Sequence, residues 1–247
     1  MQRYFVETFK DDQFFLSHED RHHIVNVMRL KTGDEIICAY NEKSALCSIA
    51  EITDEQVVAK VIKWEDESVE LPIKVAIANG LPKGDKLEWV IQKGTELGAS
   101  KFIPFTAARS IVKWDEKKAA KKVERWQRIA KEAAEQSHRQ LIPEVNTPVN
   151  LKSLLQLSRS YDFKLVAFEE DAKQGETSIL NSTLSRMEKG QSLLLVFGPE
   201  GGLDQEEVAL LKENDFESCS LGPRILRTET APLYALAAVS YHFELMR

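Results

Sequence analysis

The stretch SLLLVFGPEGGL, residues 192–203, contains the local pattern that decides the fold of this chain. Its first half is a near-continuous apolar run, as expected of a strand that is buried on both faces of a sheet. A glycine-proline turn follows, and Asp204 and Glu207 then have the spacing of a helix capping box. The stretch therefore predicts a buried strand, a tight turn and a helix over residues 204–213.

The same alternation of strands and helices recurs over residues 73–222. Compact apolar runs predict further strands at IKVAIAN (73–79), KFIPF (101–105), KLVAFE (164–169) and FESCSLG (216–222). Helical periodicity is found over residues 85–97, where Leu87, Val90 and Ile91 share one side, and over residues 115–139. We therefore predict an α/β fold with a mostly parallel sheet and helices on both faces. Ligands of such sheets bind beyond the carboxyl ends of the strands.

Residues 1–70 differ in texture and are predicted to form a small β-rich domain. The runs EIICAY (35–40), ALCSIAEI (45–52) and VVAKVIKW (57–64) are rich in β-branched residues and are separated by polar turns, a pattern typical of hairpins in a small barrel. Ser17 begins a helix with capping-box spacing, and Ile24, Val27 and Met28 predict its apolar side. The acidic, proline-ended WEDESVELP (64–72) marks a boundary, so we assign residues 71–247 to a second domain.

Composition is that of an ordinary globular protein. The chain has 247 residues, 43% of them hydrophobic, with neither an export signal nor an apolar run of membrane-spanning length. Cys38, Cys47 and Cys219 are odd in number and match no disulfide or zinc spacing, so we expect reduced thiols and a cytoplasmic location. Adjacent His22 and His23 diverge on a helix, so we interpret them as surface or RNA-facing residues and expect no metal.

Charge is distributed unevenly along the chain. The net charge is −6, which argues against indiscriminate nucleic-acid binding. Residues 101–142 nevertheless carry 11 Lys and Arg against 5 Asp and Glu. One basic face on an acidic protein indicates a selective anionic partner. A lysine-rich helix face exposed to solvent explains the same numbers equally well.

Two loops follow strands near the C-terminus. GPEGG (198–202) follows one predicted strand, and LGPRILRTETA (221–231) follows another, so the loops form a small-molecule pocket if the two strands are neighbours. GPEGG is neither G-x-G-x-x-G nor a phosphate-binding P-loop. Its glycines still allow the backbone to approach a ligand with an adenine or amino-acid moiety. A tight turn before a helix explains GPEGG equally well.

The segment LGPRILRTETA also has a purely structural interpretation. Thr230 followed by Pro232 is a sound helix start, because threonine caps first-turn amides and proline there loses no needed donor. Glu229 suits the positive end of the helix dipole. Arg224 and Arg227 remain unexplained, since cations are unfavourable at that end unless something negative or polar is bound.

Together, LVFGPEGGL (195–203) and LGPRILRTETA resemble the paired C-terminal signatures of the RsmE-type methyltransferases of the SPOUT superfamily. The likeness extends through residues 80–105, Arg109-Ser110, residues 125–143 and RHHIVNVMRLKTGD (21–34), and so covers nearly the whole chain. Gly94 departs from the pattern, where a residue such as alanine is expected, and we expect this to weaken only a local helix turn.

The resemblance implies a fold, a reaction and partners. It implies a PUA-like β-barrel in residues 1–70, a SPOUT domain with a C-terminal trefoil knot in residues 71–247, and a homodimer with active sites at the subunit interface. It also implies S-adenosylmethionine-dependent methylation of N3 of a single uridine in the 16S RNA of the small ribosomal subunit.

Candidate site residues follow from the resemblance and from charge. The resemblance implies a cofactor site formed by Phe168, Glu169, Gly198, Pro199, Glu200, Gly201, Gly202, Leu221, Gly222, Arg224, Ile225 and Leu226. Our candidates for contacts with the RNA backbone are Lys83, Lys93, Arg109, Arg128 and Arg139.

The chemistry suggests roles for two more residues. Uracil N3 carries an imide proton and is a poor nucleophile until that proton leaves. We hypothesise that Glu229, or a water that it orients, takes this proton, and that Arg227 stabilises charge on the uracil oxygens. In the alternative interpretation, Glu229 only favours the helix terminus and Arg227 only holds phosphate.

Two other functions are compatible with part of the sequence. A SPOUT ribose 2′-O-methyltransferase has a similar glycine turn, but NGLPKGDK (79–86) offers no catalytic arginine and the late motif here is RTETA. A non-catalytic RNA-binding or ribosome-assembly factor would have a barrel for RNA and a relic cofactor pocket, but the presence of both complete loops argues against it. A base-methylating enzyme is therefore favoured.

Overall fold

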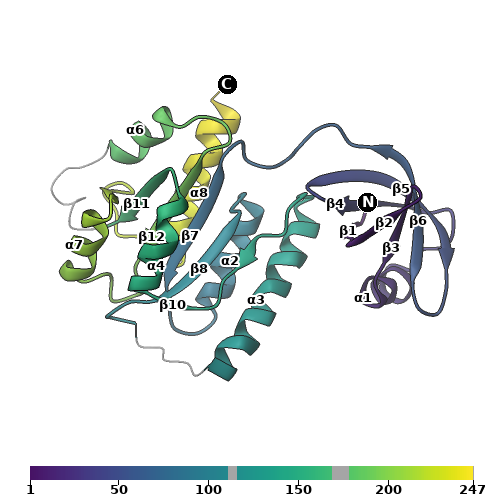
Figure 1. Ribbon diagram of the computed structural model, residues 1–247, viewed down its shortest axis with the longest axis horizontal. Coiled ribbons are helices and arrows are strands. Elements are labelled where there is room, and N and C mark those ends of the chain that lie inside the picture. Colours follow the sequence, from purple (N-terminus) through teal and green to yellow (C-terminus); the bar gives the residue numbers. More distant parts are fainter. Residues whose placement is uncertain (111–115, 169–177, 247) are drawn as a thin grey trace. The chain divides into compact units, whose positions relative to one another are not determined.

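The protein contains two separate β-sheets (Figure 1). The structure is a computed structural model that describes residues 1–110, 116–168 and 178–246. The chain divides into two compact units, each with one sheet. The first unit comprises Met1–Glu70 and Ala134–Ile142, and the second comprises Leu71–Ala133 and Pro143–Arg247. The segment Ala134–Ile142 was predicted to belong to the second domain, whereas its contacts assign it to the first unit.

The first unit is built on a six-stranded sheet in the order β1-β4-β5-β6-β3-β2. Its elements are β1 (Arg3–Phe5), β2 (Thr8–Lys10), β3 (Gln13–Leu16), α1 (His18–His22), the π-helix η1 (His23–Val27), β4 (Glu35–Tyr40), β5 (Lys43–Ile52) and β6 (Val57–Trp64). β1 pairs with β4 in parallel, and the remaining ladders are antiparallel. The predicted hairpin strands over residues 35–64 are confirmed.

The helical segment of the first unit departs from the prediction in one respect. Ser17 caps α1 by accepting a hydrogen bond from the Asp20 amide, as predicted. Ile24 is fully buried in the core, but Val27 is 56% exposed. The predicted apolar side is therefore wrong at Val27. The segment is the π-helix η1, which has more residues per turn than an α-helix, so residues at α-helical spacing do not fall on one side of it.

The second unit is a parallel α/β structure. Its elements are β7 (Lys74–Gly80), α2 (Lys86–Glu96), β8 (Lys101–Thr106), α3 (Glu116–Gln136, whose last residues enter the first unit), β9 (Glu144–Val145), β10 (Val149–Asn150), α4 (Leu151–Leu157), the 3-10 helix η2 (Ser158–Ser160), β11 (Phe163–Ala167), α6 (Ile179–Arg186), β12 (Ser192–Phe197), α7 (Gln205–Glu213), β13 (Glu217–Cys219), α8 (Thr230–Ser240) and the π-helix η3 (Tyr241–Leu245). Every ladder described in this sheet is parallel. The predicted mostly parallel sheet is confirmed.

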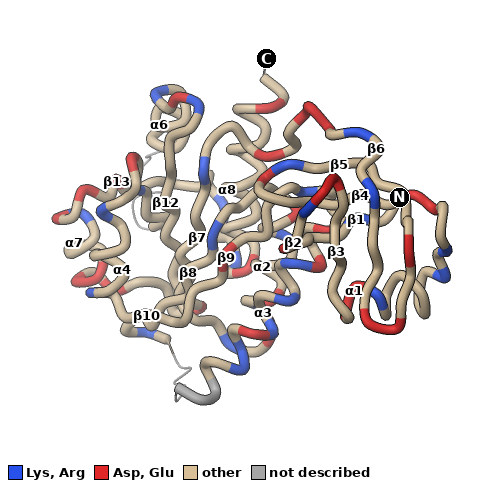
Figure 2. Tube along the Cα trace, turned by 45° about the vertical axis from the view of Figure 1, so that its right-hand side comes forward, with Lys and Arg blue, Asp and Glu red and all other residues tan. Residues whose placement is uncertain are grey.

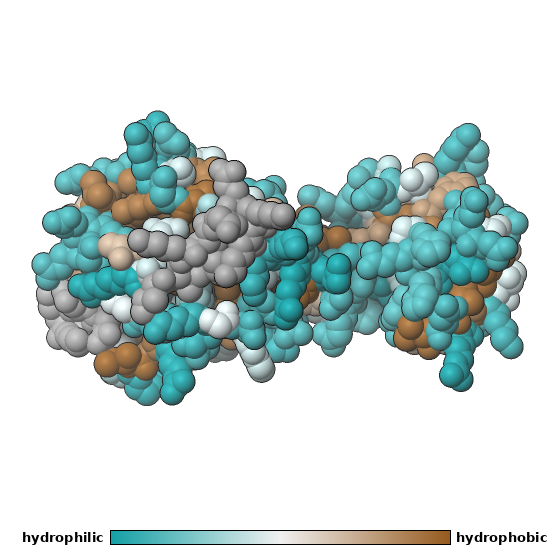
Figure 3. All heavy atoms as spheres, turned by 90° about the horizontal axis from the view of Figure 1, so that it is seen from below, coloured by the Kyte–Doolittle hydropathy of each residue, from teal (hydrophilic) through white to brown (hydrophobic). Residues whose placement is uncertain are grey.

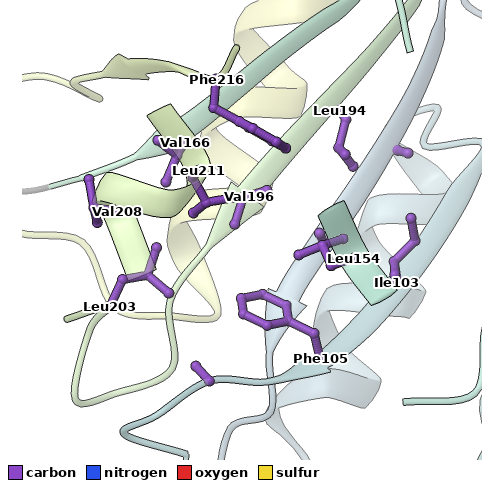
Figure 4. Packing of buried hydrophobic residues seen from close by; sticks show 13 residues of the cluster. Ile103, Phe105, Leu154, Val166, Leu194, Val196, Leu203, Val208, Leu211 and Phe216 are labelled. Carbon is purple, nitrogen blue, oxygen red and sulfur yellow. The ribbon is translucent and has the colours of Figure 1, made fainter. Parts of the chain in front are cut away.

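Both faces of this sheet are buried, as the apolar strands require. On one face, Val166, Leu194 and Val196 of the strands pack with Leu154 of α4 and Leu211 of α7 (Figure 4). On the other side, α2 packs with α8, and α8 also contacts β12. The helix α7 begins with the predicted capping box between Asp204 and Glu207. The sequence pattern of residues 192–213 is thus realised in full.

Gly94 has a packing role that the sequence did not reveal. A Cβ at Gly94 would lie 2.8 Å from Cε1 of Phe102 and 3.4 Å from Cδ1 of Leu236. Phe102 and Leu236 are themselves buried, so they have little room to move. The glycine therefore allows α2 to approach the sheet, and the expectation that it affects only a local helix turn is incomplete.

The surface is predominantly polar. On the face drawn in Figure 3, hydrophilic residues cover most of the described surface and hydrophobic ones show in separate patches. Lys and Arg recur along α3 (Figure 2), but Lys122 and Arg125 are ion-paired with Glu88 of α2. Among the described residues, no helix is long and apolar enough to cross a membrane. Cys38, Cys47 and Cys219 are all buried.

Candidate functional site

A cavity of about 560 Å³ lies at the carboxyl ends of β11 and β12. The loops after β11, β12 and β13 line it together with residues of α2 and the β8–α3 connection. The lining residues are Lys86, Arg109, Ala167, Phe168, Phe197, Gly198, Pro199, Glu200, Gly201, Gly202, Leu203, Ile225, Leu226, Arg227, Thr228 and Ala231. The strands β12 and β13 are not neighbours, because β11 lies between them in the sheet. The condition under which the sequence placed both loops at one pocket, that the two strands are neighbours, is therefore not met, yet the loops meet around one cavity.

Glycine residues allow the loop after β12 to pack closely on its surroundings. A Cβ at Gly80, the last residue of β7, would lie 2.5 Å from Cδ of Pro199. A Cβ at Gly198 would lie 2.9 Å from the backbone of Gly202 and Leu203. Since real Cβ atoms do not approach so closely, the loop needs glycine at both positions. This explains GPEGG as a tight turn and also places its backbone beside the cavity.

Three side chains hold this loop in place. The Thr228 hydroxyl donates to the carbonyl of Gly198 at 2.9 Å, and a guanidinium nitrogen of Arg109 donates to the carbonyl of Gly201 at 3.0 Å. The Glu200 carboxylate accepts from Nζ of Lys86 at 2.8 Å and from the amide of Lys83 at 3.1 Å. The loop is thereby fixed to α2, to the β8–α3 connection and to the segment before α8.

Lys86 is a site residue that sequence reasoning missed. Its ammonium pairs with Glu200 and lies 3.5 Å from Oε2 of Glu229. Chiefly the hydrogen bond with Glu200 raises the pKa of Lys86 above its ordinary value. Burial opposes ionisation of Glu200, but the hydrogen bond from Lys86, the backbone hydrogen bonds and the Lys86 charge together outweigh it and lower the Glu200 pKa. Lys86 directly follows the N-cap of α2, where a cation is unfavourable because the N-terminus of a helix is positive. This unfavourable position was the one sequence signal that Lys86 has a role outside the helix.

Glu229 occupies an unusual position at the start of α8. It is the N-cap residue, but it makes no side-chain capping hydrogen bond. Thr230 is already helical, so its predicted capping role is wrong, and the neighbouring Thr228 hydroxyl bonds Gly198 instead. Oε2 of Glu229 is buried and has no hydrogen-bond partner among the described residues. The interpretation of Glu229 as a helix cap therefore does not account for its carboxylate, whose Oε2 is paired with Lys86 instead.

The two arginines of the same loop are exposed. Arg227 lines the large cavity, and Arg224 lines a second cavity of about 100 Å³ beside it. Leu221 and Gly222 line only this smaller cavity. Ile225 lines both cavities and is 74% exposed, a large value for an isoleucine.

The predicted RNA-contacting cations have different environments. Lys83, Arg109 and Arg128 are exposed, and Lys93 is paired with Glu96 at 2.8 Å. Arg139 is only 3% exposed, and its Nε donates to Glu70 at 3.0 Å inside the first unit. This burial disagrees with a phosphate contact, because Arg139 is held within the fold. The predicted cofactor residue Glu169 lies outside the described residues.

Comparison with known proteins identifies the family. The model of the RNA methyltransferase domain matches residues 69–240, and that of the RNA methyltransferase PUA domain matches residues 16–62. The chain is 56% identical to ribosomal RNA small subunit methyltransferase E of Bacillus subtilis strain 168, over 100% of this chain and 99% of the relative. The chain belongs to the ribosomal RNA small subunit methyltransferase E family.

Solved structures of methyltransferase E proteins and their relatives share this fold. The ribosomal RNA small subunit methyltransferase E of Neisseria gonorrhoeae, bound to S-adenosyl methionine, matches with a TM-score of 0.82 and 27% identity, over 97% of each chain. A putative methyltransferase of Legionella pneumophila, also with bound S-adenosylmethionine, matches with a TM-score of 0.83 and 30% identity, over 96% of each chain. The predicted α/β domain with a PUA-like domain is confirmed, while the trefoil knot stays a prediction.

Proposed function

We propose that this chain uses S-adenosylmethionine to methylate N3 of a single uridine in the 16S RNA of the small ribosomal subunit. The observation that carries the proposal is the carboxylate of Glu229 at the start of α8, whose Oε2 pairs with the ammonium of the cavity-lining Lys86 at 3.5 Å. A carboxylate held beside the cavity, two positions along the chain from Arg227, suits removal of an imide proton. Membership of the family supports the same reaction class.

The cavity suits S-adenosylmethionine as its ligand. Its volume of about 560 Å³ lies within the range of small-molecule sites, roughly 300–1,000 Å³. Phe168, Leu203 and Leu226 give apolar lining for an adenine, and the 198–202 backbone comes close enough to offer polar atoms. We propose that the loops after β11, β12 and β13 hold the ligand. When bound, S-adenosylmethionine supplies a methyl group that is already activated on a sulfonium.

The residues of the chain then have to position and activate the uracil. We propose that Glu229, directly or through a water, accepts the N3 proton, so that the anion becomes the nucleophile. Lys86, 3.5 Å from Oε2, holds the carboxylate in position beside the cavity. Arg227 lines the cavity and stabilises negative charge on the uracil oxygens.

We also propose a homodimer that works in the cytoplasm. Large apolar side chains are exposed on α8 and η3, namely Tyr234, Tyr241 and Leu245, and Met246 follows them. Exposed apolar groups of this kind are typical of interaction surfaces. A second copy of the chain is the partner that the family resemblance implies, and sedimentation equilibrium that finds only monomers would contradict it.

For the RNA itself, we propose backbone contacts by Lys83, Lys93, Arg109 and Arg128, and we leave out the buried Arg139. Such contacts position RNA without reading its sequence. Arg109 also donates to Gly201, so it would connect the RNA to the cavity loop.

Loss of the Thr228 hydroxyl should weaken cofactor binding. The Thr228→Val variant removes the donor to the Gly198 carbonyl, and a hydrogen bond of this kind contributes about 0.5–1.5 kcal/mol. We expect the Kd for S-adenosylmethionine, measured by calorimetry, to rise roughly threefold to tenfold. The exposed neighbour Thr230 gives the matched control, Thr230→Val, which should bind normally. If the unaltered protein binds no S-adenosylmethionine at all, it is an assembly factor instead.

Primer extension across ribosomal RNA tests the proposed product. A methyl group on N3 blocks the Watson–Crick edge of uracil and should stop reverse transcriptase at one position in the small-subunit RNA. Cells that lack the gene should lose this stop, and a gene copy restored on a plasmid should return it. An identical pattern of stops with and without the gene would rule out the proposed modification.

Single-turnover kinetics on isolated small subunits tests the chemical roles. General base catalysis contributes about 10²–10⁴-fold, so Glu229→Gln should slow methylation at least 100-fold while S-adenosylmethionine still binds. Arg227→Lys should also slow the step, since lysine lacks the planar fork of donors. Exposed Glu206 of α7 provides the control Glu206→Gln. A near-normal rate in Glu229→Gln would remove Glu229 from the chemistry.

Salt dependence tests the phosphate contacts. Replacing Arg128 by alanine should weaken binding to a ribosomal RNA fragment and lower the slope of log K against log salt by about 0.9. Exposed Lys189 supplies the control Lys189→Ala, which changes the net charge equally and should leave the slope unchanged. Equal slopes for Arg128→Ala and the unaltered protein would show that Arg128 does not contact phosphate.

A further inference from the structure

The first unit has a cavity of its own, of about 580 Å³. It lies where β2, β4 and β6 present aromatic side chains, and residues 65–68 and Gln140 complete its lining. All of its lining residues belong to the first unit. The methylation proposed above does not involve this cavity.

One wall of this cavity is aromatic. Phe9, Tyr40 and Trp64 line it, and all three are only partly buried. The Phe9 ring lies 5.6 Å from the Trp64 ring and 5.8 Å from the Tyr40 ring, measured between centroids. Fully buried Phe14 packs behind them, with its centroid 5.8 Å from that of Trp64 and 6.0 Å from that of Tyr40. The rings are therefore held in fixed positions with part of their surface open to a ligand.

The rest of the lining is acidic. The chain becomes acidic directly after β6 (Figure 2), and Glu65, Asp66 and Glu67 all line the cavity, with Glu42 from the β4–β5 turn. Glu65 is paired with Arg3, but in the part of the chain that the structure describes, Asp66, Glu67 and Glu42 form no ion pair. Lys43 is the one cation in the lining. The cavity therefore has a net negative charge.

Gln140 supplies an independent indication that this cavity binds a ligand. This residue is only 5% exposed, and its Oε1 is buried without a hydrogen-bond partner among the residues that the structure describes. Its Nε2 donates to the backbone carbonyl of Glu67 at 3.1 Å. Because a carbonyl can only accept, the nitrogen of the side-chain amide must face Glu67, and the atom without a partner is the oxygen Oε1. A buried acceptor without a donor is costly, so the site lacks an N–H or O–H group.

We propose that this cavity binds an arginine side chain of a basic protein segment. Aromatic faces attract cations, and a planar guanidinium stacks on them better than an ammonium does. Its five N–H donors satisfy the free carboxylates of Asp66 and Glu67 and also Oε1 of Gln140. An RNA strand would also offer planar rings, but its phosphates would lie beside unpaired carboxylates, and this repulsion favours the protein partner.

Fluorescence titration of the full-length chain tests this proposal. The probe is the peptide Gly-Arg-Gly-Arg-Gly with blocked ends, compared with Gly-Lys-Gly-Lys-Gly and with oligouridine. We expect the arginine peptide to change tryptophan emission and to bind more tightly than the lysine peptide. Trp64→Phe should abolish the emission change while calorimetry still detects binding, because phenylalanine keeps an aromatic face.

A matched pair of double variants tests the site itself. Asp66→Asn with Glu67→Gln removes the unpaired carboxylates and should raise the Kd of the arginine peptide roughly fivefold, since exposed pairs contribute about 0.2–1 kcal/mol each. Glu51→Gln with Glu55→Gln removes the same charge from exposed positions outside the cavity. This control should raise the Kd of the arginine peptide by less than about twofold.

The remaining outcomes overturn the proposal. Equal weakening by both double variants would mean that the peptide responds only to net charge. Equal affinity for the arginine and lysine peptides would exclude guanidinium recognition. Tighter binding of oligouridine than of the arginine peptide, strengthened further by Asp66→Asn with Glu67→Gln but not by the control pair of variants, would assign the cavity to RNA. Undetectable binding of the arginine peptide at millimolar concentration would leave the cavity without the proposed partner.

Discussion

The close approach of the loop after β12 to the end of β7 is the constraint on which the cavity depends. A side chain at Gly80 would place its Cβ 2.5 Å from Cδ of Pro199, so only glycine allows the loop to turn there. Once the loop has turned, its Gly198 carbonyl reaches the Thr228 hydroxyl, and its Glu200 carboxylate reaches Lys86. The loops that follow β12 and β13 are thus joined by side chains, although β11 separates the two strands.

Much of the fold could be predicted because it is encoded locally. A strand buried on both faces must be apolar throughout, and a helix start needs a cap, so residues 192–213 revealed β12 and α7 directly. The prediction failed where geometry departs from regular periods. Val27 is exposed because η1 is a π-helix, and the short strands β1, β2 and β3 at the N-terminus have too few residues to show a period.

The candidate site could be predicted only in part, because its side chains are paired over long sequence separations. Lys86 and Glu200 are 114 residues apart, and no local pattern connects them. Long-range pairing also explains why the count of charges overestimated the free basic residues over 101–142. Arg139 pairs with Glu70, 69 residues away, and Lys122 and Arg125 pair with Glu88. The excess of basic residues over 101–142 is therefore partly accounted for by ion pairs within the fold.

Polar groups distinguish the two cavities better than their sizes do. The volumes are nearly equal, about 560 and 580 Å³, so volume alone assigns no ligand to either. Oε2 of Glu229, paired with Lys86, lies beside the first cavity, and at the second Oε1 of Gln140 is buried without a hydrogen-bond donor among the described residues. Arg227 and Arg109 accompany the first oxygen, whereas carboxylates and aromatic rings accompany the other. An acceptor among cations suits a group that loses a proton and becomes an anion, and an acceptor among carboxylates suits a permanent cation.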